Sequence, residues 1–242
     1  MKQPDGTSKK QAREGLLYGS LALLVLLLVG ADVMYFKRVA GVSAGASEAS
    51  GLADCVYDPG KAPVADFEKL IGEQDPYVGN PEASVILIEF FDPNCPHCKS
   101  LHPVMKATLA KYAGEVRLVY KPVALPQFPA SVGQNVVLFA ADEAGKFSEM
   151  LDLQFAGQKR EGISFEELKG LALQLGLDAE AIEQGFRDGT YDDRLNLQHQ
   201  HAQEAAVTGV PAVLINGRFV ATRSRTEACL GELIEAALEK AG

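Results

Sequence analysis

The sequence predicts an α/β domain in which a buried strand leads directly into a Cys-x-x-Cys helix. Three observations support this prediction: an apolar run at residues 85–91 precedes Cys-Pro-His-Cys, helical spacing fills residues 131–207, and an Asn-Gly hairpin follows. A nearly continuous apolar run is typical of a strand buried on both faces, and such a sheet needs helices on both sides. The expected order is strand, helix, strand, helical block, hairpin and final helix.

The cysteine pair is the candidate redox centre. Residues 92–94, Asp-Pro-Asn, end the strand, and Pro96 occupies a position where proline is tolerated in a first helical turn. Cys95 is therefore expected at or beside the N-cap, with Cys98 one turn into the helix. Unpaired N–H groups and the positive end of the helix dipole favour a thiolate there. His97, between the cysteines, is expected to tune the site through its N–H groups or its charge.

Structural roles for this pair are weaker alternatives. A zinc site needs further ligands, and the other two cysteines, Cys55 and Cys229, are distant singles rather than a second pair at ligand spacing. A static disulfide would close a loop too short to gain much from cross-linking. We expect Cys55 and Cys229 to bond to each other, because an oxidising compartment disfavours idle thiols. The alternative is a half-buried Cys229 and a free Cys55.

The N-terminal segment predicts membrane anchoring. Residues 16–36 are mostly apolar and long enough to span a bilayer. Four basic residues precede them and two follow, so the positive-inside rule places residues 1–15 in the cytoplasm and the catalytic domain in the periplasm or another extracytoplasmic space. We therefore expect a single-pass signal anchor in the inner (cytoplasmic) membrane. A signal peptide cleaved near residues 44–46, Ala-Gly-Ala, is the alternative.

Charge and composition indicate the domain boundaries. Residues 1–38 carry six basic and three acidic side chains, so the total charge of −9 leaves −12 for the rest, and nucleic acid is not expected as a partner. Residues 37–75 are expected to form a tether, rich in Gly, Ala and Ser at 39–51, and a short helix at 65–71. Residues 76–242 are long enough for one domain with a buried core.

Two further strand signals follow the cysteine helix. Residues 115–123 have the apolar pattern of a second buried strand. Residues 212–215 and 218–221, joined by Asn216-Gly217, carry the strongest short-range hairpin signal in the chain.

The motifs taken together resemble a known family. FFDPNCPHC at residues 90–98, a helical insertion at about 130–207 and GVPAVLINGRFV at 209–220 are similar to a thioredoxin fold with an inserted all-helical subdomain, in particular to the DsbA family of disulfide oxidoreductases. The resemblance covers about residues 77–242. The predicted fold class is therefore a thioredoxin-like α/β fold with this insertion, preceded by the single transmembrane helix.

The resemblance implies further site residues. On the family pattern Pro211 is the cis-proline beside the active-site sulfurs, which leaves the Val210 backbone free to pair with an extended substrate peptide. Glu89 and Lys121 match the charged pair that the family keeps beneath the active site. From the sequence alone, the alternative interpretations are that Glu89 is a polar residue at a strand edge and that Lys121 is a lysine at a strand end.

The remaining histidines have simpler interpretations. His102 lies one turn beyond the cysteines and is expected to be a solvated helix residue. His199 and His201 are two positions apart on a helix and point to different faces, so a metal site is not expected there.

We therefore expect a thiol-disulfide oxidoreductase that introduces disulfides into exported proteins with free thiols. A substrate thiolate attacks Cys95 of the oxidised pair, and the second substrate thiol resolves the mixed disulfide. This chemistry needs no cofactor. The resemblance implies reoxidation by a membrane partner of the DsbB type.

Two other functions remain open. A disulfide isomerase or dedicated periplasmic reductant is suggested by Asp-Pro-Asn before the first cysteine. Those relatives commonly carry threonine where this chain has Val210, and residues 37–75 are short for their dimerisation module. A copper-binding chaperone using Cys95 and Cys98 would lack an evident third soft ligand.

Overall fold

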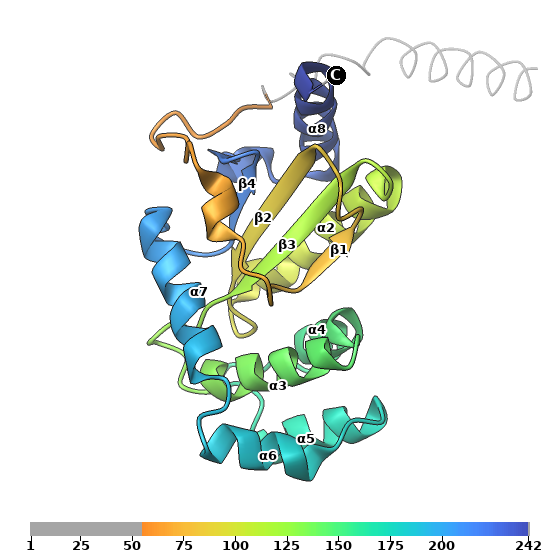
Figure 1. Ribbon diagram of the computed structural model, residues 1–242, viewed down its shortest axis with the longest axis vertical. Helices are drawn as coiled ribbons and strands as arrows, with labels where there is room; N and C mark the ends of the chain where they lie inside the picture. Colours follow the sequence, from red (N-terminus) through yellow and green to blue (C-terminus); the bar gives the residue numbers. More distant parts are fainter. Residues whose placement is uncertain (1–54, 242) are drawn as a thin grey trace, which may run out of the picture. The chain divides into compact units, whose positions relative to one another are not determined.

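A computed structural model describes residues 55–241 and is organised around one five-stranded sheet (Figure 1). The strands are β1 (Tyr77–Gly79), β2 (Val85–Phe91), β3 (Val116–Pro122), β4 (Ala212–Ile215) and β5 (Arg218–Phe219). Their spatial order is β1-β3-β2-β4-β5, with β2 and β3 parallel and the other three neighbouring pairs antiparallel. The central strands β2 and β3 are apolar along most of their length because both of their faces are covered.

Helices cover both faces of the sheet and enclose two apolar clusters. The covering elements are α2 (Pro96–Tyr112), α8 (Glu227–Ala241), the 3-10 helix η1 (Phe67–Leu70) and α7 (Asp192–Glu204). Helices α2 and α8 pack on the face that carries Leu87 and Phe91. η1 and the end of α7 lie against the face that carries Ile88 and Phe90. Consecutive residues of β2 reach both clusters because successive side chains of a strand point to opposite faces.

The helical insertion lies between β3 and β4, where the sequence predicted it. It comprises α3 (Ser131–Glu143), α4 (Phe147–Ala156), α5 (Phe165–Gln174), α6 (Ala179–Arg187) and α7. Helices α3 to α6 gather beyond one end of the sheet, and α7 returns beside it (Figure 1). Ser164 and Glu167 form a reciprocal capping box at the start of α5, and the Asp178 carboxylate accepts two backbone N–H bonds at the start of α6.

The predicted hairpin turn is present between β4 and β5. Asn216 and Gly217 both have positive φ angles, 43° and 76°, as a two-residue hairpin of this type requires. A Cβ atom at Gly217 would lie 2.3 Å from the carbonyl oxygen of Val64. Glycine is therefore needed here for backbone conformation and for close packing.

Residues 55–64 form an arm that runs along the outer edge of the sheet. Tyr57 makes a bridge to Val220, and the Asp58 N–H donates to the Phe219 carbonyl at 2.7 Å. The Val64 N–H donates to the Gly217 carbonyl at 2.9 Å. The sequence analysis placed these residues within the tether and short helix of residues 37–75; in the structure they pair along the sheet edge.

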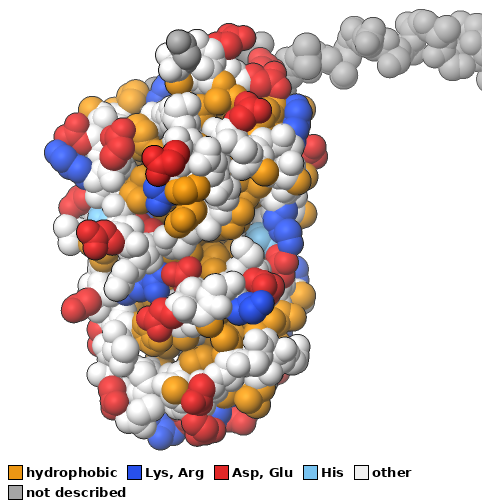
Figure 2. Space-filling view, turned by 45° about the vertical axis from the view of Figure 1, so that its right-hand side comes forward, with side chains coloured by type: hydrophobic (Ala, Val, Ile, Leu, Met, Phe, Trp, Pro, Cys, Tyr) orange, Lys and Arg blue, Asp and Glu red, His pale blue; other side chains and the backbone are white. Residues whose placement is uncertain are grey.

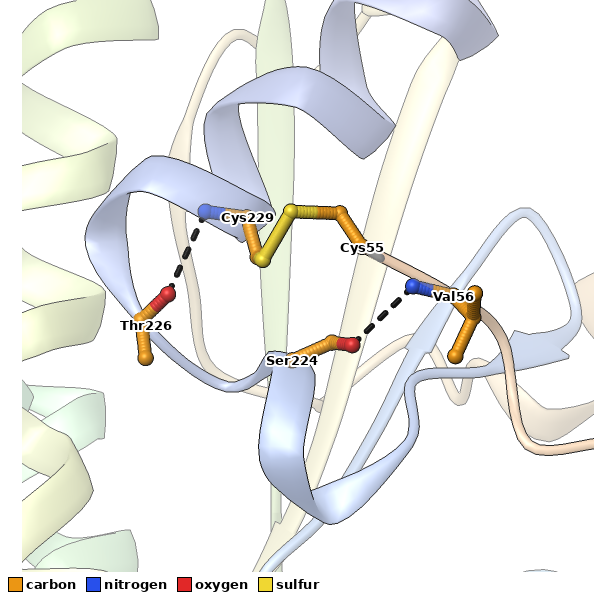
Figure 3. The surroundings of a disulfide bond; sticks show 5 residues. All are labelled: Cys55, Val56, Ser224, Thr226 and Cys229. Atoms are coloured by element: carbon orange, nitrogen blue, oxygen red, sulfur yellow. Dashed lines mark hydrogen bonds between the residues drawn. A yellow bond between two sulfur atoms is a disulfide. The ribbon is translucent and has the colours of Figure 1, made fainter. Parts of the chain in front are cut away.

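A disulfide between Cys55 and Cys229 joins the arm to α8 (Figure 3), and the predicted bond is confirmed. The two Cα atoms are 5.0 Å apart. Beside the bond, the Val56 N–H donates to the Ser224 hydroxyl at 3.0 Å and the Cys229 N–H to the Thr226 hydroxyl at 3.3 Å. The bond closes a long loop, for which cross-linking stabilises a folded chain by about 2–5 kcal/mol.

The transmembrane part of the predicted fold class is corrected. Among the helices of residues 55–241, none is long and apolar enough to cross a membrane. The longest of them, α2, has 17 residues, fewer than the ~20 that a bilayer requires. The fold that is supported is thus a thioredoxin-like α/β fold with a helical insertion. The segments assigned to the cytoplasm and the anchor, residues 1–15 and 16–36, lie outside the described residues.

Charged side chains of both signs are interspersed on the molecular face shown in Figure 2. Acidic residues outnumber basic ones over the whole chain, 32 to 23. On this face the acidic side chains are spread among apolar and basic ones.

Candidate active site

Cys95 and Cys98 occupy the positions that the sequence predicted. Cys95 is the N-cap residue of α2, Pro96 is the first helical residue and Cys98 lies in the first turn. Both thiols are free in this structure, Cys98 without exposed surface and Cys95 with 6% of its surface exposed. Pro96 and His97 are exposed. Of the two sulfurs, Cys95 is therefore the one that a substrate can reach first.

The two thiols differ in acidity. A hydrogen bond from the Cys98 thiol, the N–H groups of Cys98 and His97 and the charge of His97 lower the pKa of Cys95 to about 6, against the opposing effect of burial. Burial, followed by the hydrogen bond to Cys95, raises the pKa of Cys98 far above its ordinary value. At neutral pH Cys95 is therefore mostly thiolate and Cys98 thiol, and the thiolate is the reactive nucleophile.

The peptide bond between Val210 and Pro211 is cis, as the resemblance implied. The Cys95 sulfur lies 3.7 Å from the Val210 carbonyl oxygen, close enough for the thiol form to donate to it. The loop before β4 thus lies directly against the reactive sulfur.

A groove of about 520 Å³ opens beside these residues. Its apolar surface includes Leu101 and Val104 of α2 and Phe219 of β5. Lys61, from the arm, reaches across to donate to the Ala206 carbonyl at 2.6 Å. The groove contains Val210 and Pro211 as well, so an extended peptide lying in it would meet the cis-proline loop, whose Val210 carbonyl oxygen is 3.7 Å from the Cys95 sulfur.

Glu89 is buried beneath the site on the face that α2 covers. Its register partner on β3 is Tyr120, and paired residues on neighbouring strands share a face. Burial raises the pKa of Glu89 to about 8, with the Arg225 charge acting in the opposite direction. Its Oε2 atom is buried without a hydrogen-bond partner. Glu89 is therefore mainly protonated at neutral pH, and its charge in the ionised form would oppose ionisation of Cys98.

Lys121 does not form the expected pair with Glu89. It is the register partner of Phe90, so its side chain is on the opposite face of the sheet from Glu89. There its fully buried ammonium group contacts Asp75 Oδ2 at 2.5 Å and His201 Nδ1 at 2.7 Å. Burial lowers the pKa of Lys121, and Asp75 opposes that shift. The expected charged pair beneath the active site is thus corrected to a Lys121–Asp75 pair away from the cysteines.

Arg225, which the sequence analysis missed, supplies a cation on the cysteine side. Its guanidinium donates to the Pro211 carbonyl at 2.5 Å and to the Val220 carbonyl at 3.3 Å. Its charge also acts on Glu89 and Cys98. Arg225 therefore holds the cis-proline loop and places positive charge beside the buried thiol. It follows the hairpin in a polar turn, where no local pattern distinguishes it from a surface arginine.

The other histidines lie outside this constellation. His102 was expected to be solvated but is 9% exposed, and its Nε2 contacts Asp152 Oδ1 of α4 at 2.6 Å. His201 contacts Lys121. Within residues 55–241 no group of three or more His, Cys, Asp or Glu side chains has an arrangement that could hold a metal ion.

In the oxidised pair the Cys95 sulfur can be attacked by another thiolate, and in the reduced pair the Cys98 thiol lies close enough to form the bond again. This arrangement is suited to thiol–disulfide exchange. Fold and site together define the class as a thioredoxin-like domain with a redox-suited Cys-x-x-Cys pair. The chain belongs to the thioredoxin family, whose model matches residues 45–236.

The chain is similar to curated proteins of two kinds. The chain is 26% identical over 183 residues to the thiol:disulfide interchange protein DsbA of Burkholderia cepacia, covering 74% of this chain and 81% of that protein. It is 29% identical over 147 residues to the Na⁺/H⁺ antiporter NhaA 3 of Salinispora tropica, covering 60% of this chain but only 22% of the antiporter. The chain thus spans about a fifth of that relative's length.

A solved structure shows the same fold. BdbD of Bacillus subtilis superimposes with a TM-score of 0.63 at 17% sequence identity, covering 74% of this chain and 97% of BdbD.

Proposed function

We propose that this protein is an extracytoplasmic oxidase that transfers its Cys95–Cys98 disulfide to exported proteins with free thiols. The observation that carries the proposal is the contrast between Cys95, which keeps a small exposed surface and has a pKa of about 6, and Cys98, which has no exposed surface and a raised pKa. Known Cys-x-x-Cys oxidoreductases have first-cysteine pKa values of about 3.5 to 7, the lower values accompanying stronger oxidants. The similarity to a DsbA protein supports the oxidising direction.

The proposed reaction has two exchange steps. A substrate thiolate attacks the Cys95 sulfur of the oxidised pair, the Cys95–Cys98 bond breaks, and Cys98 takes up a proton as a buried thiol. A second substrate thiolate then attacks the substrate sulfur of the mixed disulfide, and Cys95 leaves as a thiolate. The substrate is oxidised by two electrons and the cysteine pair is reduced. The N–H groups and the charge that stabilise the Cys95 thiolate favour its departure.

An oxidising compartment is supported by the Cys55–Cys229 bond, because disulfides persist mainly in such compartments. Turnover requires a second oxidant to restore the Cys95–Cys98 bond. We propose a membrane partner of the DsbB type, on the basis of the DsbA similarity alone.

Trapping of mixed disulfides tests the proposal. In Cys98→Ala the resolving thiol is gone, so the mixed disulfides that the Cys95 thiolate forms by attacking disulfides of exported proteins should accumulate until dithiothreitol releases them. Cys95→Ala is the matched control and should trap none through Cys98. Adducts on Cys98 alone would contradict the assigned roles.

The redox state of the pair in intact cells tests the direction. An oxidase should hold Cys95 and Cys98 mostly as a disulfide when free thiols are quenched by rapid alkylation. A mostly reduced pair would contradict the oxidase proposal and favour the reductant or isomerase.

A further inference from the structure

The loop of residues 92–94, between β2 and α2, is fixed by an unusual concentration of buried polar contacts. The Asp92 carboxylate has no exposed surface. Its Oδ1 accepts from the Asn94 N–H at 2.7 Å and from the Ser131 hydroxyl at 2.7 Å, and its Oδ2 accepts from the Leu125 N–H at 2.8 Å. A buried carboxylate with three donors is costly to disturb, because each donor would lose its partner.

The helical insertion meets this loop at three separate points. At the start of α3, the Ser131 hydroxyl also accepts from the Asn94 side-chain amide at 2.9 Å. After α4, the Gln158 amide donates to the Pro93 carbonyl at 2.7 Å. Before α5, a Cβ atom at Gly162 would lie 3.1 Å from Asn94 Oδ1, so the insertion backbone passes directly against the loop.

The same loop holds both active-site sulfurs in place. The Asp92 carbonyl accepts from the Cys95 N–H at 3.0 Å, which positions the start of α2. The Asp92 N–H is among the groups that favour the ionised form of Cys98. A shift of residues 92–94 would therefore move one donor away from Cys98 and tilt the N–H groups of His97 and Cys98 relative to Cys95.

We propose that the helical insertion sets the reactivity of the cysteine pair through this loop, with Ser131 and Gln158 as positioning residues. Neither side chain touches a sulfur. The insertion thus acts on the chemistry of Cys95 by fixing residues 92–94, in addition to enclosing part of the core. The inference deepens the proposed function, since it concerns the redox properties of the same pair.

The structure gives the direction of the effect. Loosening the loop weakens the hydrogen bonds to the Cys95 thiolate, so the pKa of Cys95 should rise toward its ordinary value. The thiolate exists only in the reduced form, so the reduced pair loses stabilisation and its disulfide becomes a weaker oxidant.

The experiment measures two quantities on the full-length chain. One is the equilibrium constant of the pair in glutathione redox buffers, and the other is the Cys95 pKa from the pH dependence of its alkylation rate. Ser131→Ala and Gln158→Ala should each shift the equilibrium constant toward the disulfide about threefold to tenfold, with a Cys95 pKa rise of about half to one unit.

Thr108→Ala is the matched control. Its buried hydroxyl donates only to the Val104 carbonyl within α2, at 2.9 Å, far along the helix from the loop. Removing it should lower stability without changing either redox quantity.

Two results would overturn the proposal: unchanged values in both Ser131→Ala and Gln158→Ala, or an equal shift in Thr108→Ala. The proposed function fails separately. If the parent pair exchanges with glutathione but the Cys98→Ala variant traps no exported protein, the positioning role can stand while the oxidase role is lost.

Discussion

The low pKa of Cys95 predicts that the stability advantage of the oxidised form shrinks as the pH rises. The thiolate can form only in the reduced protein. Because its folded-state pKa, about 6, is below the unfolded value of about 8.5, its stabilising effect grows above pH 6 and is lost as the pH falls through about 6. The opposing contribution, the disulfide itself, does not titrate.

The magnitudes are similar enough to compete. Linkage gives the reduced form about 0.4 kcal/mol at pH 6 and about 2.6 kcal/mol at pH 8. We halve these values to allow for screening by water at the Cys95 sulfur, which leaves about 0.2 and 1.3 kcal/mol. The four-residue loop of a Cys95–Cys98 disulfide contributes about 2 kcal/mol to the oxidised form. The advantage of the oxidised form should therefore fall by about 1 kcal/mol between pH 6 and pH 8.

The assay is denaturant unfolding of both forms of the full-length protein at pH 6, 7 and 8, with Cys55→Ala and Cys229→Ala in every sample so that only one disulfide changes. Measurements stop at pH 8 because unfolding releases Cys98, which would then ionise above about 8.5 and oppose the trend. Glu89 titrates in both forms, so to first order its effect cancels.

Cys95→Ser is the control: it has neither the Cys95 thiolate nor a Cys95–Cys98 disulfide, so its stability should lack the corresponding pH dependence of the reduced protein. An oxidised advantage that stays constant or grows from pH 6 to pH 8 would refute the reasoning. It would mean that Cys95 is not ionised in the folded protein near neutral pH.

Three further predictions concern groups around the site. Arg225→Met removes the donors to the Pro211 carbonyl and a cation beside Glu89. The Glu89 pKa should therefore rise above about 8, and disulfide formation between Cys95 and Cys98 with oxidised glutathione should slow about tenfold. An unchanged rate would contradict the role of Arg225. Lys121→Met should lower the free energy of unfolding by about 3–5 kcal/mol because the buried Asp75 carboxylate loses its cation and keeps only the Gln198 and Gly72 donors. Adding Asp75→Asn, which removes the charge, should recover part of that loss in denaturant unfolding; no recovery would mean that the cost is packing and not charge. Removing the Cys55–Cys229 bond by alanine substitution should lower the free energy of unfolding by about 2–5 kcal/mol in denaturant unfolding. The alkylation rate of Cys95 should stay within twofold of the parent rate. A larger change in that rate would show that the arm shapes the site.

Much of the site could be predicted because its signals are local. The cysteine pair at the start of α2 depends on Pro96 and on the strand that precedes it, within one short stretch of chain. The hairpin depends on Asn216-Gly217 alone. The cis bond before Pro211 followed from the family resemblance.

What could not be predicted depends on which way a buried strand faces. β2 and β3 are apolar on both sides, so their sequences lack the alternation that would assign Glu89 and Lys121 to faces. Only the register, with Glu89 beside Tyr120, shows that the two charges point apart.

The missed contacts join residues far apart in sequence. Arg225 reaches the Pro211 carbonyl and Ser131 reaches Asp92 through tertiary packing, and neither pair has a spacing that a local pattern would reveal. The arm at residues 55–64 has the composition of a connecting segment, and only its pairing with β5 shows that it is part of the sheet edge.

The bond between Cys55 and Cys229 makes a covalent ring of nearly all the described chain. A single proteolytic cut anywhere between these residues would open the ring without releasing a fragment, so the two pieces would migrate together until a reductant is added. Cys95 and the cis-proline loop both lie inside the ring. A nicked molecule therefore keeps both halves of its active site on one covalent framework.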